Sequence, residues 1–259
     1  MTADPFAALA CYYDHIMAHV EYDRWYVATA FLGGLLPKPF RHCDVACGTG
    51  TLIKRLRKDG WQSVGIDISP AMIRTGRTAR QPWPAVVGDM RSLPLDGTVD
   101  FATCLFDSIN FLLSESEMHE AITQLSTALR PGGVLYFDFV TEEMVLQHFA
   151  GQEWTEHNGT FQTTWDCTYD RATCLSEVQV RINKGLANTF WERIHSPAAI
   201  EHALESAGLK PLAIVDGETW RRPRRKTIRV DVIAVKGNPK PYKKAFRALQ
   251  KEMQTLLRV

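Results

Sequence analysis

Long apolar runs are absent from this sequence of 259 residues, since none approaches the ~18 residues that a membrane-spanning helix needs. The N-terminus also lacks a basic segment followed by an apolar core, so we expect no secretory leader. The six cysteines include no CxxC pair, and unpaired thiols without a leader indicate a reducing cytoplasm. His42, Cys43 and Cys47 stand close together, but small buried thiols are the favoured interpretation, and we predict no metal site.

A strong overall charge is missing too, because the formal net charge is only +1. The charges are unevenly spread: residues 219–259 hold 13 of the 30 Lys and Arg but 2 of the 29 Asp and Glu. Part of this excess is the run RRPRRK at Arg221–Lys226. It is typical either of an anionic partner or of a tail lying across an acidic body. No RNA-binding module accompanies the run, so we predict that nucleic acid is not a partner.

What the sequence does contain is a glycine-rich turn, HCDVACGTG, at residues 42–50. An apolar run ends at Asp44-Val45, the next residues are small, and a helical pattern begins at Thr51. A strand that turns into a helix on small residues exposes backbone N–H groups beside the positive end of the helix. The stretch therefore predicts a site for a carboxylate, a phosphate or a ribose.

Five apolar segments alternate with helical patterns across the next hundred residues. This alternation predicts a parallel, doubly wound sheet with its ligands at the carboxyl ends of the strands. Two later segments, 212–215 and 228–235, would complete seven strands. The five segments are 42–45, 63–68, 85–87, 99–106 and 134–140.

The chain divides into four parts by pattern. A continuous helical pattern over 6–36 predicts an N-terminal helical cap, residues 1–40. Period-two stretches rich in Thr, Trp, Tyr and Val predict an antiparallel insertion, residues 141–195. Residues 41–140 and 196–236 would form the ligand-binding domain, and 237–259 a basic amphipathic helix. For that helix we rank a dimer contact first, a patch on its own domain second and an interfacial membrane helix third.

Two acids follow the second and third strands. Asp67 lies 23 residues after Asp44, where a carboxylate can accept hydrogen bonds from both ribose hydroxyls. Asp89-Met90 could meet an adenine, with the carboxylate on its amino group and the methionine against the ring. Together with the glycine turn, these positions describe an adenosine-type cofactor.

Two cofactors of that type compete. A dinucleotide prefers GxGxxG, but the run that begins with Gly48 and Gly50 has Ile53 where the third glycine would stand.

 Leu105–Asn110 also offers no evident hydride chemistry. A sulfonium nucleoside needs only a bare turn beside its amino-acid part, so the sequence fits S-adenosylmethionine better.

These motifs resemble those of the class I S-adenosylmethionine-dependent methyltransferases. DVACGTGTL is similar to the family's first motif, with Ala46 where glycine is commonest, and VGIDIS to its ribose-binding strand. GDM resembles the adenine-binding turn, TCLFDSINFLL the fourth strand, and LRPGGVLYFDF the approach to the fifth. The opening YYDHI…EYDRW looks like the cap of bacterial small-molecule enzymes, including glycine and amino-sugar N-methyltransferases.

The resemblance implies a Rossmann-like fold of seven strands, an N-terminal helical cap and an antiparallel substrate lid after strand five. It also implies cofactor contacts from aromatic residues of the cap. The predicted cofactor-binding residues are Tyr13, Tyr22, Trp25, Ala46, Gly48, Gly50, Asp67, Ile68, Met72, Asp89, Met90, Leu105 and Asn110. The predicted substrate-binding residues are Tyr12, Phe106, Phe139, Trp165, Trp191 and Arg193.

Methyl transfer is an in-line displacement from an activated sulfonium, and alignment alone can supply on the order of 7–11 kcal/mol. No covalent residue is needed, and a general base only where the acceptor must lose a proton early. His195 and Asp107 are the predicted candidates for that base, with His15 a third. The competing interpretations are a helix-entry residue for His195 and a structural carboxylate for Asp107.

The sequence therefore predicts methylation of a nitrogen or oxygen atom of a small metabolite. Methylation of RNA or protein through the basic tail is the first alternative. A cofactor-binding scaffold without turnover is the second.

Overall fold

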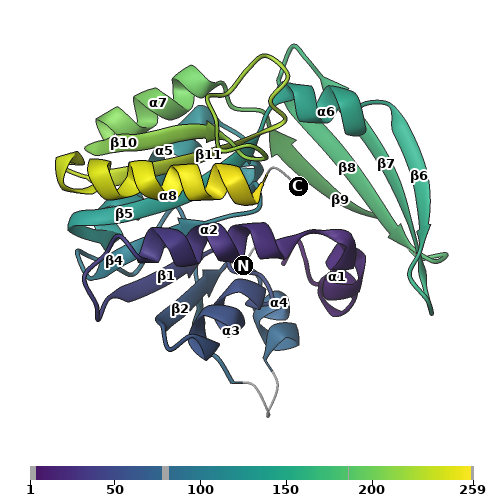
Figure 1. Cartoon of the computed structure of the whole chain (residues 1–259). Coiled ribbons are helices and arrows are strands. Elements are labelled where there is room, and N and C mark those ends of the chain that lie inside the picture. Colours follow the sequence, from purple (N-terminus) through teal and green to yellow (C-terminus); the bar gives the residue numbers. More distant parts are fainter. Residues whose placement is uncertain (1–3, 78–81, 186, 258–259) are drawn as a thin grey trace.

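The computed structural model describes residues 4–77, 82–185 and 187–257, and its centre is a seven-stranded sheet in the order β10-β11-β5-β4-β1-β2-β3 (Figure 1). The five strands from β3 to β5 run parallel, β11 pairs antiparallel with β5, and β10 antiparallel with β11. The predicted α/β fold of seven strands is confirmed. The strands are β1 Arg41–Val45, β2 Gln62–Asp67, β3 Ala85–Val87, β4 Val99–Cys104, β5 Leu129–Val140, β10 Leu209–Asp216 and β11 Arg229–Lys236.

Strand β5 is longer than predicted, because it begins at Leu129 rather than at Val134. Leu129 pairs with Val99, and Val134 pairs with Phe101, so the register shifts between these two pairs. The stretch RPGG accommodates the extra residues as an irregularity within the strand. The predicted segment 134–140 did not include these residues.

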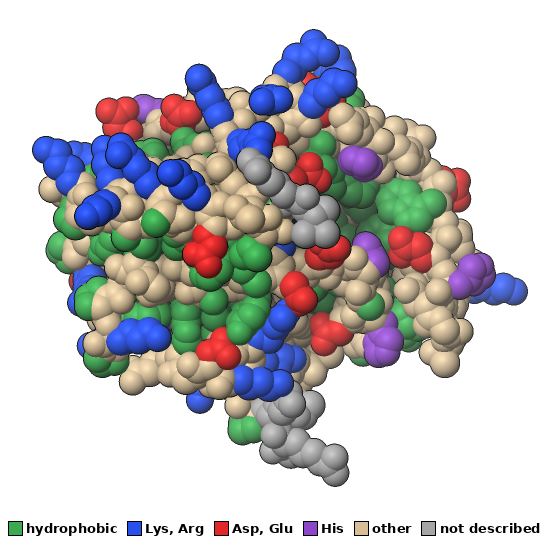
Figure 2. Space-filling view, viewed as in Figure 1, with side chains coloured by type: hydrophobic (Ala, Val, Ile, Leu, Met, Phe, Trp, Pro, Cys, Tyr) green, Lys and Arg blue, Asp and Glu red, His purple; other side chains and the backbone are tan. Residues whose placement is uncertain are grey.

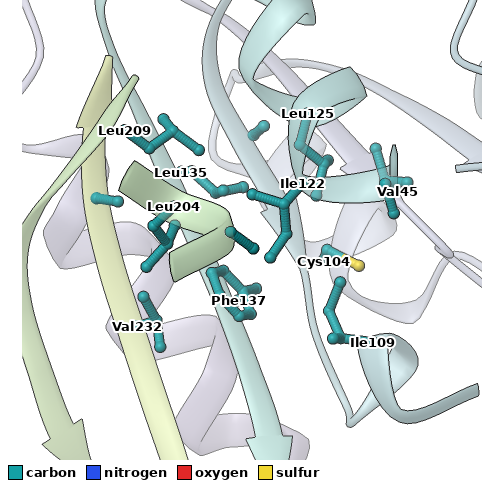
Figure 3. Packing of buried hydrophobic residues seen from close by; sticks show 14 of the residues in the cluster. Val45, Cys104, Ile109, Ile122, Leu125, Leu135, Phe137, Leu204, Leu209 and Val232 are labelled. Atoms are coloured by element: carbon teal, nitrogen blue, oxygen red, sulfur yellow. The ribbon is translucent and has the colours of Figure 1, made fainter. Parts of the chain in front are cut away.

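Two helices, α5 (Glu115–Ala128) and α7 (Pro197–Ser206), pack on one face of the sheet. Figure 3 shows Ile122 and Leu125 of α5 and Leu204 of α7 directed toward Leu135 and Phe137 of β5. All five side chains are completely buried. A capping box at Ser114 and Glu117 fixes the start of α5. This core fixes the carboxyl ends of the parallel strands at one edge of the sheet, where a ligand site is expected in this fold.

The opposite face is covered by α2 (Tyr22–Gly33) and α8 (Lys243–Leu256), which lie side by side in Figure 1. Phe246, Leu249 and Met253 of α8 are buried in the same cluster as Trp25 and Leu32 of α2. The apolar stripe of α8 is thus covered by its own domain. Ranking a dimer contact first for these side chains was wrong. Figure 2 shows Lys and Arg side chains gathered on the outer side of α8.

The N-terminal cap is not the continuous helix that the pattern predicted. It consists of α1 (Ala10–Ile16), the 3-10 turn η1 (Met17–His19) and α2, which are separated where Val20 takes an extended conformation. Two carboxylates fasten the cap to the sheet domain. Asp14 accepts a hydrogen bond of 2.6 Å from Thr49, and Asp4 accepts bonds from the Ser69 hydroxyl and the Ala71 N–H.

The insertion after β5 consists of α6 (Glu142–His148) and a four-stranded antiparallel sheet, as predicted. This sheet stands to the right of the central sheet in Figure 1. Its strands are β6 Gln152–His157, β7 Gln162–Asp170, β8 Leu175–Ile182 and β9 Ala187–Arg193. Because side chains alternate across a strand, one face of this sheet is directed toward the domain and the other away from it.

The remaining helices, α3 (Thr51–Lys58) and α4 (Pro70–Gly76), follow β1 and β2. Within the described part of the chain, every helix is too short or too polar to cross a bilayer.

Candidate active site

A cavity of about 520 Å³ lies between the carboxyl ends of the central strands, the N-terminal cap and the inserted sheet. The glycine turn and Asp67 line its central-sheet side, α1 and α2 contribute aromatic rings, and β6 to β9 supply a third wall. The predicted parts of the molecule therefore meet at one site. Figure 2 gives the outer surface around these elements, with apolar side chains between the sheet domain and the insertion.

The glycine turn is held by the carboxylate of the next strand. Ala46, Gly48 and Gly50 all have positive φ angles, of 58°, 55° and 76°. The Gly48 N–H donates to Asp67 at 2.7 Å, and the Ser69 N–H donates to the other Asp67 oxygen at 2.8 Å. A carboxylate offers about four acceptor positions, so two remain for a ligand. Burial raises the pKa of Asp67, and the two backbone N–H bonds oppose that rise.

Ala46, Gly48, Asp67, Ile68, Met72, Met90 and Leu105 all line the cavity, as do Tyr13, Tyr22 and Trp25 from the cap. Burial raises the pKa of Tyr13 well above its ordinary value and that of Tyr22 to about 12, so both hydroxyls keep their protons. Each tyrosine also contributes to the shifted pKa of the other. The indole Nε1 of Trp25 is buried and has no partner within the described residues. Because buried N–H groups are normally hydrogen-bonded, we expect a ligand to supply the acceptor for this one.

Three predicted cofactor-binding residues do not line the cavity. Gly50 lies against Trp83, whose ring would overlap any Cβ at that position, so its small size serves packing. Asp89 forms an ion pair of 2.6 Å with Arg91, whose hydrogen bonds lower the pKa of the carboxyl. Asn110 is fully buried and bonds to the backbones of Val140 and Arg193. Its amide joins two chain segments rather than facing a ligand.

The turn that follows β4 contains two residues with left-handed backbones, Phe106 at φ 63° and Asp107 at φ 51°. The Phe106 N–H donates to Asp138 at 2.6 Å, which stabilises this unusual turn. Arg229 from β11 donates to Asp107 at 2.8 Å and also to Asp138. Burial raises the pKa of Asp107, while the neighbouring Arg229 lowers it. Both Phe106 and Asp107 line the cavity, as their predicted roles require.

Four predicted substrate-binding residues lie elsewhere. Phe139 is buried in the core under α5 and α7, and Tyr12 packs on Phe161 with ring centroids 4.8 Å apart. Trp191 is 41% exposed, and Arg193 donates to the Thr173 carbonyl. Those last two belong to the outward face of β9. Of the predicted set, Phe106 and Trp165 line the cavity.

His195 does not reach the cavity either. The ring is buried, and Nε2 is 2.9 Å from the Leu112 carbonyl. Burial lowers the pKa of His195, so the ring is neutral near pH 7. His15, the third candidate, lies beside Phe161 outside the cavity.

Sequence reasoning missed Glu192, which lines the cavity from β9. Its neighbours Trp191 and Arg193 were chosen instead, and they lie on the other face of the strand. Glu192 pairs with Ser176, and Phe190 with Val178, and all four line the cavity. Side chains two residues apart in a strand lie on the same face, so Glu192 could have been predicted from the apolar residue Phe190.

The residues present fit S-adenosylmethionine. Asp67 retains acceptor capacity at the position for a ribose, and a bare Gly48 leaves space beside Met72. The unpartnered Nε1 of Trp25 supplies a buried donor. Aromatic rings of Tyr22, Trp25 and Phe106 surround the same space and are suited to a sulfonium, because a cation is attracted to ring faces. The fold and this site agree with those expected of a class I S-adenosylmethionine-dependent methyltransferase domain.

Comparison with known proteins agrees with this assignment. Residues 43–133 match the family described as "Methyltransferase domain". YqeM of Bacillus subtilis (strain 168) is 29% identical over 164 residues, which are 62% of this chain and 65% of that protein. The dTDP-3-amino-3,4,6-trideoxy-alpha-D-glucopyranose N,N-dimethyltransferase of Streptomyces venezuelae is 30% identical over 92 residues, 36% of this chain and 39% of that one. The chain thus spans less than two thirds of the length of either relative.

Solved structures share the fold over nearly the whole chain. An S-adenosylmethionine-dependent methyltransferase from Clostridium acetobutylicum ATCC 824 aligns with a TM-score of 0.76 at 21% identity, covering 90% of this chain and 99% of that one. CalS10, an amino pentose methyltransferase from Micromonospora echinaspora solved with S-adenosylmethionine bound, aligns with a TM-score of 0.67 at 22% identity. That alignment covers 88% of this chain and 96% of CalS10. The fold class and the cofactor class inferred from the sequence are both confirmed.

Proposed function

We propose that this chain transfers a methyl group from S-adenosylmethionine to a nitrogen or oxygen atom of a small molecule. The observation that carries the proposal is the shared cavity, in which Asp67 on one side and the β6–β9 wall on the other enclose a single space. Relatives that methylate amino sugars support a small-molecule acceptor. The α1–α2 cap and the inserted sheet would enclose the acceptor.

Bound S-adenosylmethionine would supply the activated methyl group. Asp67 would hold the ribose hydroxyls, and Met72 and Met90 would pack beside the purine. Tyr13, Tyr22 and Trp25 would close the cavity and exclude water. Enclosure of this kind aligns the acceptor and removes competing water, which is most of what an in-line transfer requires.

Two titrations followed by an acceptor screen test the proposal. S-adenosylmethionine and S-adenosylhomocysteine are first titrated into the protein in a calorimeter. Isotope-labelled methyl transfer is then measured with small amines and alcohols. Absence of binding by both nucleosides would refute the proposal, whereas binding without transfer to any acceptor would favour a scaffold.

The alternative of RNA methylation would depend on the exposed run Arg221–Lys226. That run lies in the connection between β10 and β11 and does not line the cavity. Binding to RNA through it should weaken steeply as salt is raised from low to moderate concentration. No observation in the described residues favours this alternative over a small molecule.

A further inference from the structure

The inserted sheet provides a mostly apolar wall of the cavity. The side chains that it directs into the cavity are mostly apolar or aromatic, and Trp154 and Trp165 are stacked with centroids 5.6 Å apart and planes 7° apart. Val178, Val180 and Phe190 continue this surface. Such a wall suits an apolar acceptor, because few polar groups are present to replace the hydration of a sugar. The polar residues on the same wall are Glu156, Ser176 and Glu192.

Two of these three polar residues have partners already. Glu156 accepts a hydrogen bond of 3.0 Å from the Trp154 indole, and Ser176 donates to the Thr168 carbonyl. Glu192 has neither a hydrogen bond nor a salt bridge to any described residue. An enclosed carboxylate without a partner is costly, so a complementary group from a ligand would stabilise it.

The charge around the cavity favours a cationic ligand. Its basic lining residues are His19, Arg55 and Arg229. Arg229 is engaged by Asp107 and Asp138, and Arg55 forms an ion pair of 2.6 Å with Asp23. Little positive charge is left for a phosphate, whereas Glu192 is available for a cation. A nucleoside-diphosphate sugar is therefore a poor match for this wall.

We propose that the methyl acceptor is an apolar amine whose ammonium group is bound and deprotonated by Glu192. This inference rests on the proposed methyl transfer and names its acceptor class and base. The unpartnered indole Nε1 of Trp25, a residue that is 7% exposed, lies in the same cavity and, as a donor, suits the cofactor rather than the ammonium.

The proton step balances within the cavity. One N–H bond of the bound ammonium breaks, its electron pair stays on nitrogen as the lone pair, and the proton moves to a Glu192 oxygen. Burial, followed by the charge of Asp107, raises the pKa of Glu192 to about 8, while Arg229 lowers it. At that pKa the empty cavity holds Glu192 largely protonated near neutral pH, and a bound ammonium favours its ionised form, which is then a stronger base than an ordinary carboxylate. Glu156 on β6 also lines the cavity and adds to the negative charge.

One competing role for Glu192 is contact with the sulfonium of the cofactor. The two roles make different predictions. A sulfonium contact would favour S-adenosylmethionine over the uncharged S-adenosylhomocysteine. An acceptor contact would leave that ratio of affinities unchanged when the carboxylate is removed.

The test uses the full chain saturated with S-adenosylhomocysteine, so that no turnover occurs. Phenethylamine and tryptamine are titrated by calorimetry, with 2-phenylethanol and tryptophol as uncharged counterparts. Titration in buffers of different ionisation enthalpy gives the protons exchanged on binding. Glu192→Gln is compared with the wild type, and Glu153→Gln, an exposed residue of β6, serves as the matched control.

We expect the amines to bind the wild type about ten- to a hundredfold more tightly than the alcohols, as a charge-assisted contact would produce. Glu192→Gln should remove that preference and the proton exchange, leaving alcohol binding and the melting temperature near the wild-type values. Equal binding of amines and alcohols by the wild type would overturn the inference. So would a changed affinity ratio for the two nucleosides in Glu192→Gln. Failure of both nucleosides to bind the wild type would instead refute the proposed methyl transfer itself.

Discussion

Asp67 at the end of β2 accepts a 2.7 Å hydrogen bond from the backbone N–H of Gly48 in the turn after β1. The carboxylate that is proposed to bind the ribose thus also fixes the loop beside it. Cofactor binding and the shape of the turn are therefore coupled through one side chain.

Replacing Asp67 with Ala should weaken binding of S-adenosylmethionine by on the order of 1–3 kcal/mol, because charge-assisted hydrogen bonds are lost. Calorimetric titration with S-adenosylhomocysteine measures the change without turnover. Asp166→Ala, at an exposed position of β7, is the control and should bind as the wild type does. Unchanged affinity in Asp67→Ala would contradict the ribose assignment.

Gly76→Ala should destabilise the protein by about 1–3 kcal/mol, in the range of overpacked sites. A Cβ at this last residue of α4 would overlap the backbone carbonyl of Thr49, and so would push the glycine turn out of place. Urea unfolding gives the loss of stability, and nucleoside titration the accompanying loss of affinity. The neighbouring exposed change Thr75→Ala should alter neither quantity. A Gly76→Ala protein as stable as the wild type would show that the contact is not tight.

Acid should destabilise the fold partly through His42. Burial lowers the pKa of this ring to about 3, while the imidazole of an unfolded chain titrates near about 6.5. Between those two values the unfolded state binds the proton and the native state does not. His42 therefore does not destabilise the fold above about pH 6.5. As the pH falls below that value, the free energy of unfolding decreases by at most about 1.4 kcal/mol per pH unit.

The measurement compares the free energy of unfolding of the wild type and His42→Gln at several pH values from 7 to 4. The variant loses the bonds to Ser63 and Thr103, so it should be less stable at pH 7. The difference between the two proteins should shrink as the pH falls. A difference that is constant with pH would refute the assignment of a neutral buried ring.

Helix α8 should stabilise its own domain. Phe246→Ala removes a ring that is 3% exposed, and should cost about 3–5 kcal/mol of unfolding free energy. Leu256→Ala on the same helix affects a side chain that is 49% exposed, and should change stability by less than about 0.5 kcal/mol. Thermal unfolding at several protein concentrations checks both. A concentration-dependent melting temperature that Leu256→Ala abolishes would instead point to self-association through this helix.

The central sheet could be predicted from sequence because local signals there agree with the global fold. The glycine turn, Asp67 and the alternating apolar segments each follow from nearest neighbours in the chain. The cap pattern was less informative, since apolar spacing continued across Val20 although the backbone leaves the helix there.

The inserted strands were predicted, but the face of β9 was not. Trp191 and Arg193 were predicted to bind substrate, but side chains alternate along the strand and these two lie on the outer face. Glu192 comes to line the cavity only through the fold, which brings β9 near Asp107 and Arg229. His195 could not be excluded from sequence, because its bond to the Leu112 carbonyl joins residues 83 positions apart.

Asn110 is hydrogen-bonded to the chain at both ends of the insertion. Its side-chain oxygen accepts from the Val140 N–H at 3.0 Å, and its side-chain nitrogen donates to the Arg193 carbonyl at 2.9 Å. The whole lobe consequently emerges from the central domain through a narrow stem with fixed geometry. Natural or laboratory recombination could swap that lobe for another without cutting any strand of the seven-stranded sheet. Diversification of acceptor choice would then leave the nucleoside pocket intact.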